Sequence, residues 1–100
     1  MREYELYLVI DGDAADESVA ATIDKVTKLI LAGYGGTVGE MIKVEARGKR
    51  RLAYPIRKKV EGQDLVLNFR TPQQALPEID RMLKLDDLVL RYLAIRLDEE

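Results

Sequence analysis

The sequence has no cysteine and no histidine. Without cysteine it can form neither a disulfide nor a thiolate metal site. Without histidine it can form neither an imidazole metal site nor a catalytic triad of the Ser/His/Asp or Cys/His type. Any catalysis would have to use carboxylates, lysine, arginine or tyrosine. We therefore expect no metal site, no cofactor and no catalytic residue.

Long apolar runs are missing as well, because none approaches the roughly 18 to 20 residues that a membrane helix needs. The first five residues, Met-Arg-Glu-Tyr-Glu, lack the basic stretch and the apolar segment of a secretory leader. We expect a cytoplasmic protein that makes no membrane contact and acts on no small-molecule substrate. The absence of cysteine is compatible with that compartment.

The chain length sets the number of domains. One hundred residues, 47% of them hydrophobic and 34% charged, fit a compact globule. Such a chain can bury about 65% of its unfolded surface around one core and is too short for two. We expect a single domain over residues 1–100, with a short acidic C-terminal end over residues 98–100 that frays.

The charge is unevenly distributed. The net charge of −2, taken alone, argues against a nucleic-acid-binding protein. Half of the 16 basic side chains nevertheless lie in residues 43–59, opposed there only by Glu45. A solvated loop is the alternative explanation for such a run, but Tyr54 inside it can stack on a base, which favours binding of RNA or another polyanion. The basic residues of this segment are Lys43, Arg47, Lys49, Arg50, Arg51, Arg57, Lys58 and Lys59.

Alternating apolar residues predict four strands, over residues 4–10, 37–56, 65–69 and 88–97. Gly48 interrupts the second strand and predicts a bulge or bend, after which the alternation resumes through residues 50, 52, 54 and 56. Pro55 has no amide hydrogen to donate, which predicts an edge strand or a strand end. The second and third strands can form a hairpin, connected by residues 58–63.

Apolar residues at helical spacing predict two helices between these strands. The first carries its apolar stripe from Val19 to Ile30, with Asp13 or Asp16 as N-cap and glycine from position 33 onward as the stop. The pair Thr71-Pro72 predicts the start of the second helix. Pro77 would remove a backbone hydrogen bond there, so we expect a distorted first turn or a later start.

The order of elements, β-α-β-β-α-β, predicts an α+β protein with the ferredoxin-like split βαβ sandwich. Two helices then cover one face of a four-stranded antiparallel sheet. The other face is open, so side chains such as Tyr7 and Val9 need either solvent or a partner.

Two segments carry a family resemblance. Residues 48–58, Gly-Lys-Arg-Arg-Leu-Ala-Tyr-Pro-Ile-Arg-Lys, and residues 1–5 closely resemble the bacterial small-subunit ribosomal protein six family. Near the end, Asp87, Val89 and Arg91 stand where that family has an Asp, an aliphatic residue and an Arg. The resemblance covers essentially the whole chain. It implies a non-enzymatic component of the bacterial ribosome that binds the central domain of small-subunit ribosomal RNA as a heterodimer with small-subunit protein eighteen.

The same resemblance implies a binding surface. It assigns to the RNA- or partner-facing side the residues Arg2, Lys49, Arg50, Arg51, Tyr54 and Arg91. The basic segment adds Arg47, Arg57 and Lys58, and Tyr4 is a further candidate because its ring could stack on a base. Three of these have alternative explanations. Tyr4 could be a residue at the edge of the core, Tyr54 could pack on the following proline, and Arg91 could pair with Glu3 or Glu5 on a neighbouring strand.

The sequence departs from the family at two positions of the predicted hairpin. Arg47 stands where many members have an aromatic residue, which exchanges stacking for phosphate contact. Asp64 also stands where an aromatic residue is common, so we expect a contact on the open face to be missing.

Other functions remain as alternatives. An acyl-phosphate-cleaving enzyme of this fold would need an anion-binding first turn and a positioned Asn, whereas the turn here is Asp11-Gly12-Asp13 and the sole asparagine is Asn68. A ferredoxin-like regulatory or interaction module without RNA binding is the stronger alternative. An engineered relative made for folding studies would also keep the core pattern.

Overall fold

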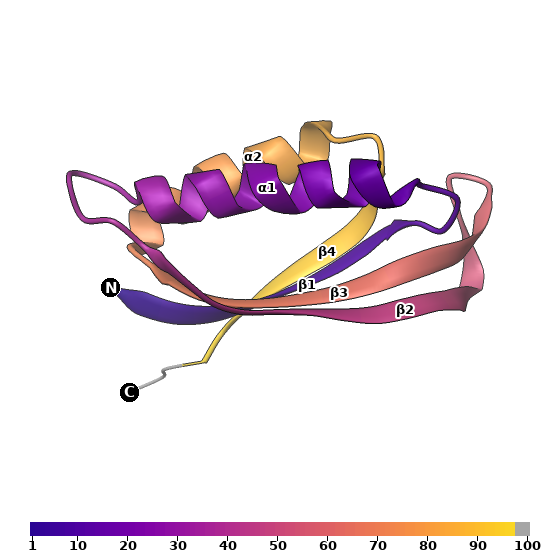
Figure 1. Cartoon of the computed structure of the whole chain (residues 1–100), viewed down its shortest axis with the longest axis horizontal. Coiled ribbons are helices and arrows are strands. Elements are labelled where there is room, and N and C mark those ends of the chain that lie inside the picture. The colour runs from indigo at the N-terminus through magenta and orange to yellow at the C-terminus, as the bar shows by residue number, and fades with distance from the viewer. Residues whose placement is uncertain (98–100) are drawn as a thin grey trace.

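The computed structural model describes residues 1–97, so the acidic end over residues 98–100 lies outside the described residues. Its strands are β1 (Arg2–Asp11), β2 (Glu40–Ile56), β3 (Lys59–Thr71) and β4 (Val89–Arg96). Its helices are α1 (Asp16–Ala32), the short 3₁₀ turn η1 (Gln73–Ala75) and α2 (Leu76–Leu85). The strands form one antiparallel sheet in the order β2-β3-β1-β4, and both helices cover one face of it (Figure 1). This arrangement confirms the predicted ferredoxin-like fold.

The core lies between the sheet and the helices. Alternate residues of β1 and β3 point toward α1 and α2, as the period of two predicts. Tyr4 packs against Phe69 with a ring-centroid separation of 5.7 Å. The core residues with 3% or less of their surface exposed include Leu6, Leu8, Ile10, Leu65 and Leu67 of the sheet and Val26, Ile30, Ile79 and Leu83 of the helices.

The ends of α1 differ in how well they were predicted. Its N-cap is Ala15, which makes no side-chain capping bond, so the prediction of Asp13 or Asp16 is wrong. The Asp11 carboxylate instead accepts a hydrogen bond from the Asp13 amide at 2.9 Å, which uses the acidic cluster for the turn before the helix. The predicted glycine stop is confirmed. Gly33 has φ 63°, and a Cβ there would lie 1.8 Å from the Thr37 carbonyl oxygen.

The second helix begins later than Thr71-Pro72, as Pro77 predicts. A 3₁₀ turn follows Pro72, and α2 then carries Pro77 in its first turn, where the missing amide hydrogen costs no helical hydrogen bond. Ile79 and Leu83, one turn apart, bring α2 onto the sheet.

The hairpin of β2 and β3 is longer than predicted. A two-residue turn, Arg57–Lys58, replaces the connection predicted over residues 58–63, and β3 starts at Lys59. The bulge predicted at Gly48 is confirmed by a register shift and by φ 88°. The alternation predicted through residues 50–56 is interrupted, because residues 52–55 of β2 bulge out opposite a single residue of β3. β2 is an edge strand, as Pro55 predicts.

Candidate nucleic-acid interface

Residues 49–59, which we name the hairpin arm, form the end of the β2–β3 hairpin and reach beyond the first turn of α1 (Figure 1). At its tip, Arg57 and Lys58 have φ values of 50° and 67°. Both central residues of a two-residue turn of this hand need positive φ, a conformation that usually selects Asn and Gly. The tip thus holds two exposed cations in a backbone conformation that disfavours them.

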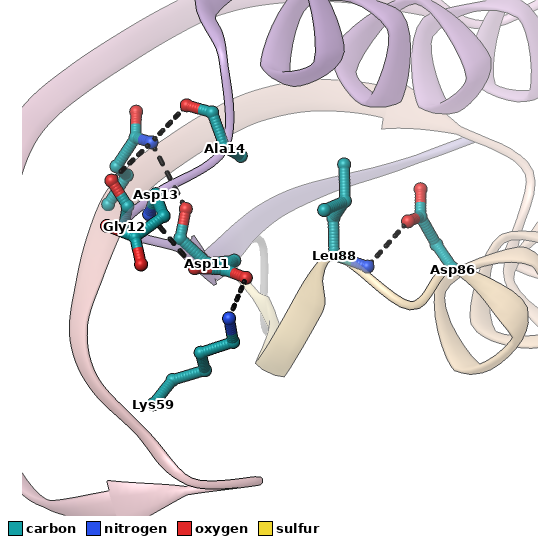
Figure 2. A network of polar contacts seen from close by, with 8 residues as sticks. Asp11, Gly12, Asp13, Ala14, Lys59, Asp86 and Leu88 are labelled. Atoms are coloured by element: carbon teal, nitrogen blue, oxygen red, sulfur yellow. Dashed lines mark hydrogen bonds and ion pairs between the residues drawn. The ribbon is translucent and has the colours of Figure 1, made fainter.

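The β3 side of the hairpin is tied to the end of β1 and the turn after it. Lys59 Nζ lies 3.2 Å from Asp11 Oδ2, and Gln63 Nε2 donates to the backbone oxygens of Asp11, Gly12 and Ala14 (Figure 2). The pKa of Asp11 is lowered, chiefly by the hydrogen bond from the Asp13 amide and further by Lys59, against an opposing effect of burial. Lys59 is therefore engaged within the protein, whereas the tip cations Arg57 and Lys58 are exposed.

Under the arm, on the open face of the sheet, lies a buried carboxylate. Asp64 is only 4% exposed, and its Oδ2 lies 2.7 Å from Arg50 Nε and accepts a hydrogen bond from the Tyr7 hydroxyl at 3.3 Å. Within the described part of the chain, Asp64 Oδ1 is buried without a hydrogen-bond donor. The contact expected to be missing at this position is thus replaced by an ion pair and a hydrogen bond.

A second cation lies on the same face. The Arg47 guanidinium sits 5.9 Å from the centroid of the Tyr7 ring, at the distance of a cation–π contact. Glu45 lies 3.8 Å from both Lys43 and Arg47. These exposed pairs contribute little to stability, but they orient the basic side chains along β2.

The bulge over residues 52–55 bends the arm toward β1 and β4 and encloses a groove. Arg91 Nη1 donates to the Tyr54 hydroxyl at 3.2 Å, which joins the arm to β4. The groove has a volume of about 550 Å³, and its lining includes Tyr7, Val9, Arg51, Leu52 and Leu93. It combines an apolar floor with arginines at its rim.

Gly62 allows the arm to lie this close to the sheet. A Cβ at that position would stand 2.7 Å from Val9 Cγ1 and 3.1 Å from Leu52 Cδ2. The first distance is shorter than a Cβ contact allows and the second is tight, so a larger residue would displace the Val9 and Leu52 side chains.

The structure brings together most of the predicted site residues. Arg50, Arg51, Tyr54 and Arg91 surround the groove. Lys49 and the tip residues Arg57 and Lys58 continue the positive surface along the arm, and Arg47 flanks it on β2.

Two predicted residues lie elsewhere. Arg2 is half-buried and pairs with Thr71 at the opposite end of the sheet from the arm. Tyr4 is 3% exposed in the core, so its ring cannot stack on a base and its assignment to the binding surface is wrong. Its place in the alternation with Leu6 and Leu8 already favoured the core.

The structure also places the two residues with alternative explanations that lie near the groove. Tyr54 is 59% exposed, and its hydroxyl accepts a hydrogen bond from Arg91. Arg91 therefore contacts the arm, whereas Glu3, its suggested partner, lies 3.9 Å from Arg70.

Sequence reasoning missed the structural role of Asp64. Its position after Gly62 and among the apolar residues of β3 was visible, and a carboxylate there needs a cation. Over residues 1–97 there is no cluster of three acidic side chains placed to hold a metal ion. No helix in that range combines the length and apolarity needed to cross a membrane.

Comparison with known proteins identifies relatives over the full chain. The family model described as ribosomal protein S6 matches residues 3–96. The small ribosomal subunit protein bS6 of Corynebacterium efficiens is 39% identical over 99% of this chain and 100% of its own length. The protein of the same name from Moorella thermoacetica is 38% identical over 100% of this chain and 98% of its own length. The crystal structure of 30S ribosomal protein S6 from Thermotoga maritima has a TM-score of 0.84 at 29% identity, covering 96% of this chain and 87% of that one.

The matched range includes the basic segment that carries the resemblance, and these relatives are small-subunit proteins of bacteria, so the predicted family is confirmed. The chain belongs to the ribosomal protein S6 family and is a structural, non-enzymatic protein of the small subunit of the bacterial ribosome, in the cytoplasm.

Proposed function

We propose that the chain binds the central domain of small-subunit ribosomal RNA as a heterodimer with small-subunit ribosomal protein eighteen. The observation that carries this proposal is the hairpin arm. It gathers Lys49, Arg51, Arg57 and Lys58 as exposed cations on a projection that the ion pair of Lys59 ties to Asp11. Each cation that reaches a phosphate releases a counterion, which drives binding and makes it sensitive to salt.

Recognition would depend on the shape of the folded RNA. The arm offers one exposed aromatic side chain, that of Tyr54. Of the other tyrosines that line the groove, Tyr7 lies beneath Arg47, and the hydroxyl of Tyr92 donates to Asp80. This arrangement differs from the pair of exposed aromatic residues with which sheet-based readers of single strands stack two bases. Phosphate contacts from a rigid arm suit the backbone of a folded RNA junction instead.

The protein partner would occupy the open face of the sheet next to β4. Leu93 and Ile95 are 60% and 42% exposed there, and Leu93 also lines the groove. Adjacent exposed apolar side chains beside a groove are typical of a protein-binding surface. The net charge of −2 weakens the attraction of the isolated chain for RNA. A basic partner would supply the missing positive charge.

The test is a titration of the protein into a central-domain ribosomal RNA fragment, with and without protein eighteen, at two salt concentrations. We expect binding that requires the partner and weakens as salt rises. The variant Arg57→Gln/Lys58→Gln should bind about tenfold more weakly and reduce the salt slope by about 1.5, because it removes two phosphate contacts.

The matched control removes two exposed cations from the helical side, Lys25→Gln/Lys28→Gln on α1. It changes the net charge equally and should bind RNA like the parent protein. Equal losses in both double variants would mean that the arm has no special role. Absence of binding with and without the partner would favour the interaction module that does not bind RNA.

A further inference from the structure

The two neighbouring arginines of the arm differ in their surroundings. Arg50 stands opposite Gly62 in the β2–β3 register, and its Nε lies 2.7 Å from the Asp64 carboxylate. Arg51 stands opposite Glu61, and among residues 1–97 it has no ion pair. Since successive side chains of a strand alternate between faces, Arg50 is directed toward the open face of the sheet and Arg51 away from it.

Asp64 holds Arg50 strongly because its carboxylate has few other hydrogen-bond partners. It is almost completely buried, one of its oxygens has no donor in the described part of the chain, and the other is shared by Arg50 and Tyr7. A buried carboxylate needs a cation, and a short charge-assisted hydrogen bond to guanidinium is among the stronger contacts available to it. Arg50 is thereby held on the open face, although its side chain is 61% exposed.

The same contact weakens the attraction of Arg50 for phosphate. A phosphate about 4 Å from the Arg50 guanidinium would lie about 6 to 7 Å from the Asp64 carboxylate. Coulomb energy falls inversely with distance, so the repulsion from Asp64 cancels about 60% of the attraction to Arg50. Arg50 should therefore contribute less to phosphate binding than Arg51, which has no ion pair among residues 1–97.

We propose that Asp64 removes Arg50 from the phosphate-binding set by holding it on the open face, so that Arg51 and the tip residues make the phosphate contacts. The inference rests on the proposed RNA binding and refines it. It assigns different roles to two adjacent arginines that the sequence does not distinguish. It also assigns a role to Asp64, the aspartate that stands where an aromatic residue is common in the family.

The first experiment compares Asp64→Asn with Asp13→Asn, which removes the same charge from an exposed turn. Asparagine keeps the size of the side chain but releases Arg50. We expect Asp64→Asn to bind the central-domain RNA with protein eighteen roughly threefold to tenfold more tightly, with a salt slope steeper by about 0.7 to 0.9 from one added phosphate contact. Asp13→Asn should change neither quantity. Weaker binding with an unchanged slope would assign Asp64 a purely structural role and overturn the proposal.

A second variant removes the pair together. Arg50→Met/Asp64→Asn leaves no buried charge unpaired and should fold even if Asp64→Asn alone does not. We expect it to bind RNA with an affinity within about twofold of the parent. Arg51→Met should lower the affinity about threefold to tenfold and release one counterion fewer on binding. A loss for the double variant as large as that for Arg51→Met would identify Arg50 as a phosphate contact and refute the proposal.

Elution from heparin, used as a simple polyanion, separates this inference from the proposed function. If the parent protein binds no ribosomal RNA, the proposed function fails. Heparin still tests the inference in that case, because Asp64→Asn should elute at higher salt than Asp13→Asn. Identical elution of the two variants would refute the role of Asp64.

Discussion

The turn at the tip of the arm should be replaceable by a more stable one. Arg57 and Lys58 have φ values of 50° and 67°, a region that costs L-residues about 1 to 2 kcal/mol each. Asparagine and glycine adopt it more easily, although glycine also loses about 0.5 to 1 kcal/mol through the entropy of the unfolded chain. The difference predicts that Arg57→Asn/Lys58→Gly raises the free energy of unfolding by about 1 kcal/mol. For a chain of this size, the midpoint of thermal unfolding would rise by about 4 to 8 °C.

Urea unfolding followed by far-ultraviolet circular dichroism measures this change, and the midpoint should move at an unchanged slope. The control is Arg57→Gln/Lys58→Gln, which removes the same charges and keeps the strained turn, so its stability should equal that of the parent. Both variants should lose the same RNA affinity. A stabilised glutamine variant would attribute the gain to relief of charge repulsion, and a turn variant no more stable than the parent would refute the argument from backbone strain.

Three further predictions concern the arm and the sheet. Arg51→Glu should change the free energy of unfolding by less than about 0.5 kcal/mol, whereas Arg50→Glu, which sets a carboxylate against Asp64, should lower it by about 2 to 3 kcal/mol in urea unfolding. Gly62→Ala should destabilise the protein by about 1 to 3 kcal/mol and shift the methyl resonances of Val9 and Leu52, because its Cβ has no room between them. Burial and the hydrogen bond to Asp80 raise the pKa of Tyr92 to about 12, so stability should be complete below pH 10, where tyrosine is neutral in both states, and fall as pH rises toward 12. Tyr92→Phe should flatten that fall in urea unfolding measured from pH 9 to 12.

The fold was predictable because its signals are local. The period of two in β1 and the 3.6-residue period in α1 locate the core, and the glycine at position 33 ends α1 for a steric reason. Where two interpretations of one residue competed, the alternation was correct: it placed Tyr4 beside Leu6 in the core, whereas the capacity of its ring to stack on a base placed it on the surface. A hydrophobic pattern reports burial directly, whereas an aromatic ring by itself only permits stacking.

The arm was less predictable because its geometry depends on register and on distant partners. An Arg-Lys pair carries no signal for a tight turn, so the connection was predicted over residues 58–63, although the turn is Arg57–Lys58 and β3 begins at Lys59. The contact of Tyr54 with Arg91 joins residues 37 positions apart and follows from the bulge over residues 52–55. Neither periodicity nor spacing contains such information, which is why the groove appears only in three dimensions.

The features that lower stability gather in and beneath the arm. Its tip holds two non-glycine residues at positive φ, and Asp64 beneath it is buried with one oxygen unpaired. Backbone strain and unsatisfied polar atoms persist where they serve binding, since selection for stability alone would remove them. In the turn, a gain in stability requires the loss of two cations. If the arm is the RNA-binding surface, the substitutions that stabilise it most should also be those that change RNA binding, and equally exposed substitutions on α1 should separate the two properties.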